Sequence, residues 1–326
     1  MKKRMFSGIQ PTGNLHLGNY LGAIRQWASL QAKYDSIFSV VDLHAITSLQ
    51  EPDKLRSKTL EMAGLLIACG IDPATSTMFV QSHISGHSEL AWVLECATPV
   101  GWLRRMTQFK EKAAESESVS TGVLAYPALM AADILLYHAD VVPVGDDQTQ
   151  HLEMTRDLVK RFNSLYGETF TMPEQIVADK GGRIMALDNP VRKMSKSADR
   201  PGHAIYLLDS AEEIRGKIGR ATTDSQKEIR FDVAGPGIHN LLTIYEILTG
   251  SAQDEIESRF QGKGYAHLKS ELAEVIAGTL SPIQERYRDV ADESGYIESI
   301  LEQGASRLRP IAQETLRLVY SRVGLR

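Results

Sequence analysis

Short runs of β-branched and aromatic residues alternate with helical patterns over the first 200 residues of the chain. Strand-like runs occupy residues 5–9, 37–42, 77–81 and 140–144, and each one stops at a turn or a polar residue. Helical spacing of apolar residues follows in residues 19–33, 53–69 and 148–162. Strand, helix and strand in this order predict βαβ units, and therefore an α/β fold with helices on the faces of a parallel sheet.

Strand patterns fade after residue 205, and helical patterns take their place at residues 210–220, 237–248, 252–260, 265–287 and 295–320. We therefore predict two domains. The first, residues 1–205, is a Rossmann-like α/β domain with a doubly wound parallel sheet. The second, residues 206–326, is mostly helical, and its last helix is a candidate to pack back on the first domain.

The composition narrows the class of protein without naming it. With 326 residues, the chain is long enough for two domains. It has no apolar run long enough to cross a bilayer and no secretory pattern at its start, and its two cysteines form no CxxC pair, so we expect a cytoplasmic protein without a membrane partner. The net charge of −5 argues weakly against nucleic acid binding, although a local basic face is enough to meet phosphates.

A glycine-rich turn, residues 8–22, connects the first strand to the first helix. Ligands bind at such places in α/β sheets, because backbone N–H groups and the helix dipole favour phosphate. Gly18 and Gly22 leave room for a planar base, and His16 is a candidate donor to a phosphate oxygen. An ordinary glycine-bearing turn with a surface histidine has the same pattern, so this segment alone indicates no more than a nucleotide.

A second segment, Lys-Met-Ser-Lys-Ser at residues 193–197, follows the loop sequence Asp188-Asn189-Pro190. Flexible lysines with neighbouring hydroxyl groups suit a mobile loop that closes on a phosphate chain. A solvated basic loop is the alternative interpretation, and it is the more common one for such a run taken alone.

The third segment, residues 125–137, is apolar nearly all round and predicts a buried helix that contains one carboxylate, Asp133. A buried carboxylate is costly without a donor. The donor can come from a neighbouring helix or a backbone cap, or from a ligand. An indole has one N–H donor and no acceptor, which suits Asp133 beside an apolar wall formed by Met130.

Together, the first two segments resemble the HIGH and KMSKS sequences of class I aminoacyl-tRNA synthetases. His16, Leu17, Gly18 and Asn19 stand at the four HIGH positions, and asparagine at the last one is usual in the tryptophanyl branch. The third segment points to the same branch, because the tyrosyl branch usually has Gln where this chain has Met130.

The resemblance extends to residues 41–47, 105–112, 143–151 and 283–287. Two departures, Leu43 in place of a frequent Gln and Asp146 in a segment where Gly-Glu-Asp is frequent, keep size or charge.

The resemblance implies that ATP activates L-tryptophan to tryptophanyl-adenylate, that the amino acid passes to tRNA(Trp), and that AMP and diphosphate are released. It further implies Mg²⁺ with the ATP, no metal bound by protein ligands, a homodimer, and a helical domain that reads the anticodon. The implied catalytic residues are His16, Lys193, Ser195 and Lys196. The implied ATP-binding residues are Gln10, Pro11, Thr12, Gly18, Asn19, Gly145, Asp146, Asp147, Ile184, Lys193, Met194, Ser195, Lys196 and Ser197. The implied amino-acid pocket consists of Phe6, Gly8, His44, Met130, Asp133, Val142, Val144 and Gln148.

Three alternatives remain open at this point. A tyrosyl-tRNA synthetase would activate tyrosine in place of tryptophan. A nucleotidylyltransferase that adenylates a small metabolite usually lacks KMSKS and a large helical domain. A non-catalytic paralogue would bind tRNA or tryptophan without consuming ATP. The basic residues Arg104, Arg105, Lys110 and Lys112 are equally compatible with a tRNA-binding face and with a solvated helix face.

Overall fold

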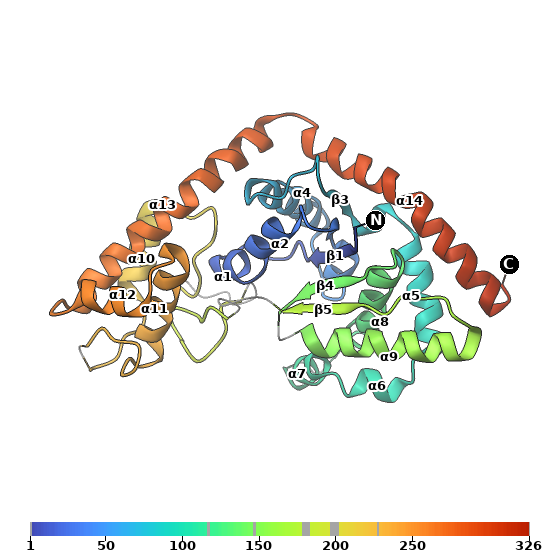
Figure 1. Cartoon of the computed structure of the whole chain (residues 1–326), viewed down its shortest axis with the longest axis horizontal. Coiled ribbons are helices and arrows are strands. Elements are labelled where there is room, and N and C mark those ends of the chain that lie inside the picture. Colours follow the sequence, from blue (N-terminus) through green and yellow to red (C-terminus); the bar gives the residue numbers. More distant parts are fainter. Residues whose placement is uncertain are drawn as a thin grey trace.

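A parallel sheet lies at the centre of the molecule (Figure 1). The computed structural model describes residues 2–115, 118–145, 148–177, 183–195, 202–226 and 228–325. Within these ranges the sheet has five strands, β1 (Arg4–Ile9), β2 (Asp35–Val40), β3 (Thr77–Val80), β4 (Val141–Val144) and β5 (Glu174–Val177), in the order β3-β2-β1-β4-β5. All neighbouring pairs are parallel. The chain therefore winds in both directions from β1, which confirms the doubly wound α/β prediction.

Apolar side chains leave the strands alternately toward two helical layers. Met5, Phe38 and Met78 belong to the core that is shared with α2 (Arg25–Leu30) and α4 (Pro52–Ala68). Phe6 and Phe79 belong to a second core that is shared with α5 (Gly86–Ala97), α8 (Thr121–Leu135) and α9 (Thr149–Tyr166). Because successive residues of a strand point to opposite faces, a sheet that is covered on both sides needs near-continuous apolar strands, as this sequence has.

Several local features differ from the sequence predictions, and helix α5 is one that was not predicted. Strand β5 was not predicted at all, because Glu174–Val177 is short and half polar. The helix predicted at residues 19–33 starts earlier, as α1 (Leu17–Asn19), and passes through a π-helical turn (Tyr20–Ile24) into α2. Asp42, predicted as the end of a strand, instead begins the short helix α3 (Asp42–Ala45).

The C-terminal part is helical over α10 (Ala211–Arg220), α11 (Pro236–Thr249), α12 (Gln253–Phe260), α13 (Tyr265–Asp292) and α14 (Tyr296–Val323). Helices α10 to α12 gather at one end of α13, and α14 turns back over the sheet (Figure 1). At Gly304, a Cβ atom would lie 1.8 Å from the carbonyl oxygen of Met78. This close approach covers the edge strand β3, which would otherwise expose unpaired backbone groups.

The domain boundary at residues 205 and 206 stays a prediction. Within the described ranges, no helix is long and apolar enough to span a lipid bilayer.

Candidate active site

A cavity of about 1170 Å³ opens at the carboxyl ends of β1 and β4. The strand order reverses between these two strands, which is where ligands bind in doubly wound sheets. Its walls come from the glycine-rich turn after β1, from α3 and α8, and from the residues that follow β4. Segments that lie more than 100 residues apart in the sequence therefore share one chamber.

The cavity brings together most of the site residues that the sequence predicts. Those that line it are Phe6, Gly8, Gln10, Thr12, His16, Gly18, Asn19, His44, Met130, Asp133, Val142, Val144, Gly145, Gln148, Ile184, Lys193 and Met194. Two described residues, Pro11 and Ser195, do not line it: Pro11 is buried and Ser195 is half-buried. Asp146, Asp147, Lys196 and Ser197 lie outside the described residues.

His16 begins α1 and closes its first turn. Its Nδ1 accepts the Asn19 backbone N–H at 3.2 Å, and the Asn19 side-chain oxygen accepts the His16 backbone N–H at 3.3 Å. Because Nδ1 is an acceptor, a neutral His16 carries its proton on Nε2. A Cβ atom at Gly18 would lie 3.1 Å from His16 Nδ1, so glycine at this position allows the imidazole to adopt its orientation. The cap thus fixes the orientation of the His16 imidazole at the cavity wall.

Ile184 and Lys193 reach the cavity on two short antiparallel segments. The Met194 N–H donates to the Ile184 carbonyl at 3.0 Å, and Met185 pairs with Lys193. Asn240 on α11 holds these segments from behind, because its side chain accepts from the Met185 N–H at 2.9 Å and donates to the Met185 carbonyl at 3.0 Å. The C-terminal helices therefore support the part of the wall that carries the lysine.

The glycine-rich turn is joined to the same C-terminal helices. The Leu17 N–H donates to the Ile205 carbonyl at 2.8 Å, and the Leu207 N–H donates to the Leu15 carbonyl at 2.9 Å. Gln284 on α13 donates in turn to the Leu207 carbonyl at 2.8 Å. The two segments that the sequence predicts to contact phosphate are the glycine-rich turn and the segment that carries Lys193. Both are therefore anchored to the helical part of the chain.

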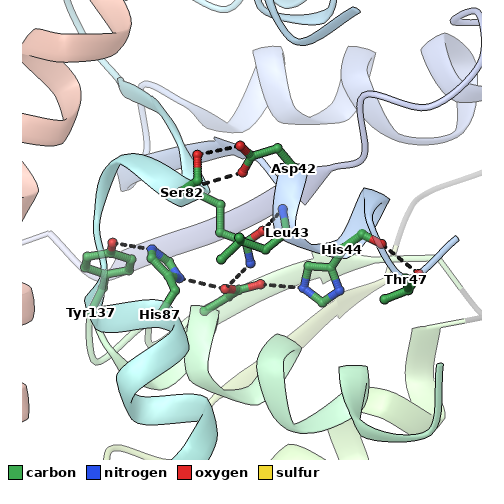
Figure 2. Close-up of polar contacts among 9 residues, drawn as sticks. Asp42, Leu43, His44, Thr47, Ser82, His87 and Tyr137 are labelled. Atoms are coloured by element: carbon green, nitrogen blue, oxygen red, sulfur yellow. Dashed lines mark hydrogen bonds and ion pairs between the residues drawn. The ribbon is translucent and has the colours of Figure 1, made fainter. Parts of the chain in front are cut away.

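Asp133 is 2% exposed and accepts three hydrogen bonds (Figure 2). His44 Nε2 lies 2.8 Å from Oδ2, and Oδ1 lies 2.6 Å from both Gln81 Nε2 and His87 Nδ1. Burial by itself raises the pKa of this carboxyl, but the hydrogen bonds from His44 and His87 outweigh burial and hold the pKa below its usual value. The sequence analysis left open which groups donate to Asp133, and neighbouring side chains supply three of these hydrogen bonds. Since each carboxylate oxygen accepts about two hydrogen bonds, Oδ2 keeps one acceptor position.

Gln81 and His87 were missed by the sequence analysis. Gln81 begins the short 3₁₀ turn Gln81–His83 after β3, and His87 lies in the first turn of α5, a helix that the sequence analysis did not predict. Both side chains are fully buried. A glutamine directly after β3 and a histidine in the first turn of the next helix are the local indications of such a role, and neither residue type is specific for one.

A second wall is built around Tyr126 on α8. Its hydroxyl donates to Gln108 Oε1 at 2.7 Å and lies 2.6 Å from His151 Nε2. Lys112 Nζ lies 5.7 Å from the centre of the Tyr126 ring and also lines the cavity. The sequence analysis included Tyr126 and Lys112 within residues 125–137 and 105–112, but it did not place them in this wall.

The described wall of the cavity carries few charged side chains. Among the described wall residues, the lysines are Lys112 and Lys193, and the one carboxylate is Asp133, which is tied to its donors. Apolar side chains, including Phe6, Met130 and Val142, lie around that carboxylate. The arrangement suits a ligand that has an anionic end and an apolar end with one hydrogen-bond donor.

The model of one protein family, tRNA synthetases class I (W and Y), matches residues 1–281. The chain belongs to this family. The synthetase is 54% identical over 326 residues to a tryptophan–tRNA ligase from Wolinella succinogenes, covering 100% of this chain and 99% of that protein. The resemblance predicted from the signature segments is confirmed.

Solved structures agree with this placement. A tryptophanyl-tRNA synthetase from Mycoplasma pneumoniae superposes with a TM-score of 0.93 at 37% identity, covering 100% of this synthetase and 99% of that chain. A tryptophanyl-tRNA synthetase from Campylobacter jejuni, complexed with ADP and tryptophan, superposes with a TM-score of 0.85 at 35% identity, covering 99% and 100%. The likeness therefore includes the helical part as well as the sheet.

Proposed function

We propose that this synthetase activates L-tryptophan with ATP, forms tryptophanyl-adenylate and transfers the tryptophan to tRNA(Trp), with release of AMP and diphosphate. The observation that carries the proposal is the single cavity that joins the glycine-rich turn, the Lys193 segment and the Asp133 helix. Relatives that match over the full length are tryptophan–tRNA ligases, which supports the same conclusion.

The indole of tryptophan occupies the apolar end of the cavity in this proposal. Met130 provides a soft wall, and the remaining acceptor position on Asp133 Oδ2 receives the indole N–H. The other residues proposed for this pocket are Phe6, Gly8, His44, Val142, Val144 and Gln148. A tyrosine phenol would also bring an oxygen that accepts hydrogen bonds, and the apolar Met130 offers it no donor, so the pocket favours tryptophan.

ATP occupies the opposite end. Gly18 leaves room for the base, and Ile184 packs on it, while His16 directs its Nε2 proton toward a phosphate oxygen. Gln10, Thr12, Asn19, Gly145 and Met194 complete the proposed nucleotide contacts. Pro11, which is buried beneath the wall, shapes the turn without lining the cavity.

The first step needs no general base, because the tryptophan carboxylate is already an anion at neutral pH. A carboxylate oxygen forms a bond to the α-phosphorus of ATP as the bond to the pyrophosphate oxygen breaks. Lys193 and His16 stabilise the charge that develops on the phosphates, so positioning and electrostatics supply the catalysis. Roles for Ser195, and for Asp146, Asp147, Lys196 and Ser197 beyond the described residues, rest on the family resemblance. In the second step, a hydroxyl of the terminal adenosine of the tRNA attacks the tryptophanyl carbonyl and releases AMP.

Mg²⁺ would neutralise charge on the phosphate chain during the first step. Asp133 is the only carboxylate among the described wall residues, and its oxygens already accept from histidine and glutamine. We therefore expect the ion to be held by phosphate oxygens and water, in keeping with the way proteins usually bind Mg²⁺ with ATP.

The partner proposals rest on surface features. Arg104, Arg105 and Lys110 are exposed, and Lys112 connects this basic cluster to the cavity wall, which suits a tRNA end that enters the cavity. We also propose a homodimer, a cytoplasmic location and an anticodon-reading role for residues 206–326. Trp92 on α5 is 67% exposed, and a second copy of the chain would cover it.

The test is aminoacylation by the purified chain with labelled tryptophan, ATP, Mg²⁺ and a tRNA(Trp) transcript. We expect labelled tRNA and an equal amount of AMP, and no labelling of a tRNA(Tyr) transcript. Consumption of ATP without labelled tRNA would instead indicate an adenylating enzyme that acts on another acceptor.

A further inference from the structure

A chain of hydrogen bonds runs from Tyr137 through His87 to Asp133, and its Tyr137–His87 part is labelled in Figure 2. The Tyr137 hydroxyl lies 2.7 Å from His87 Nε2, and His87 Nδ1 lies 2.6 Å from Asp133 Oδ1. An ionised carboxylate only accepts hydrogen bonds, so His87 must donate through Nδ1–H. His87 and Tyr137 do not line the cavity, whereas Asp133 does.

The Tyr137 hydroxyl anchors the imidazole of His87 and supports the tautomer that Asp133 requires. Burial and the neighbouring charge of Asp133 raise the pKa of Tyr137, so it remains a neutral phenol that can donate its proton. Its ring is held by Phe6, with stacked ring centres 6.0 Å apart, and by Phe79 in an edge contact at 5.8 Å. The O–H therefore points to Nε2, and the remaining imidazole proton stays on Nδ1.

Gln81 holds the same carboxylate oxygen from another side. The Leu43 backbone N–H donates to Gln81 Oε1 at 3.0 Å, which leaves the amide NH₂ facing Asp133 Oδ1 at 2.6 Å. The turn that carries Gln81 is itself tied to α3, because the Ser82 N–H donates to Asp42 at 3.0 Å (Figure 2). With two donors, Oδ1 is saturated and the rotation of the carboxylate is fixed.

We propose that His87, Tyr137 and Gln81 are positioning residues that determine the specificity of this site. They fix the Asp133 carboxylate so that only Oδ2 keeps an acceptor position, placed beside His44 on the cavity wall. This inference rests on the proposed function, because it requires an indole N–H at Oδ2.

Loss of the Tyr137 hydroxyl leaves His87 Nε2 buried without its donor and removes one anchor of the imidazole, so the hydrogen bond from His87 Nδ1–H to Oδ1 is held less firmly. The carboxylate then rotates more freely, and its acceptor position is shared among several directions. Binding of a ligand that donates an N–H should suffer, whereas binding of a ligand of the same shape without the N–H should not.

The test compares tryptophan with 3-(benzothiophen-3-yl)alanine, in which sulfur replaces the indole N–H. In ATP–pyrophosphate exchange, the preference is kcat/KM for tryptophan divided by kcat/KM for the analogue. We expect Tyr137→Phe to lower this ratio by about tenfold, because the groups of one hydrogen-bond network are coupled. The KM for ATP should be unchanged. Tyr245→Phe is the matched control. It also removes a buried hydroxyl that donates to a carboxylate, Glu271, at 2.6 Å, but it lies in the helical part of the chain. The control should keep the wild-type ratio.

A second pair of variants tests the same point at His87. The amide of His87→Asn can still donate to Oδ1, so this variant should keep much of the preference for tryptophan over the analogue. His87→Leu has no donor and should lose that preference. An unchanged ratio in Tyr137→Phe, or equal ratios in the two His87 variants, overturns the inference. If the wild-type enzyme shows no exchange with tryptophan, the proposed function itself fails, so the two failures are distinguishable.

Discussion

Replacing Asp133 with asparagine should remove recognition of the indole N–H while keeping the fold. The amide oxygen can still accept from Gln81 and His87, which both donate to Oδ1 in the wild-type chain. The amide NH₂ then replaces Oδ2 and faces His44, which can adopt the tautomer that accepts at Nε2. At the position proposed for the ligand, the amide NH₂ of the variant then faces the indole N–H. Two donors meet, and no hydrogen bond forms between them.

The magnitude follows from the loss of one hydrogen bond to a charged group, which is worth about 1.5–3 kcal/mol. At about 1.4 kcal/mol for each factor of ten, kcat/KM for tryptophan should fall by roughly 10- to 150-fold. Alanine is a poorer probe here, because it would strand three buried donors and destabilise the fold by several times about 1–3 kcal/mol.

The assay is tryptophan-dependent ATP–pyrophosphate exchange, with thermal unfolding measured on the same samples. The benzothiophene analogue provides the reference, since the substitution should leave its kcat/KM nearly unchanged. If Asp133→Asn lowers kcat/KM equally for tryptophan and for the analogue, Asp133 does not receive the indole N–H and this account of the pocket is wrong.

Three further predictions concern stability and reactivity. Gly304→Ala should destabilise the chain by about 1–3 kcal/mol or more, because its Cβ would overlap the backbone of β3. The control, Gly278→Ala on the exposed face of α13, should stabilise the chain by about 0.4–1 kcal/mol. Equal effects of the two substitutions in thermal unfolding would refute the close packing of α14. Burial raises the pKa of Cys69 to about 12, so a thiol reagent at about pH 8 should titrate only the exposed Cys96 in the native chain and both thiols after denaturation; two fast thiols would contradict the buried position. The pKa of Asp133 is lowered in the folded chain, so its ionisation contributes stability above the ordinary pKa of about 4, and this stability is lost as the pH falls through the lower folded value. Asp133→Asn should therefore flatten the acid side of the plot of melting temperature against pH. An unchanged slope would argue against the depressed pKa.

The central strands could be predicted because they have the near-continuous apolar pattern that a sheet covered on both faces requires. Strand β5 could not, since Glu174–Val177 has only four residues at an edge of the sheet, and its pairing with β4 is fixed by tertiary contacts. The continuous helix predicted from residue 19 concealed the cap at His16, because an imidazole that accepts a backbone N–H has no distinctive sequence pattern.

At the site, the apolar helix around Asp133 was enough to predict its burial, and its 2% exposure agrees. Its partners were not predictable, because Gln81 and His87 lie 52 and 46 residues away along the chain. Hydrophobic periodicity locates a buried polar residue, but it does not identify which distant side chain satisfies it.

The central claim is that the cavity at the carboxyl ends of β1 and β4 activates tryptophan with ATP. It is tested most directly by ATP–pyrophosphate exchange without tRNA, measured side by side with tryptophan and with tyrosine. The account predicts exchange that depends on tryptophan and remains at background with tyrosine. Exchange that tyrosine supports as well as tryptophan, or no exchange with either amino acid, would contradict it.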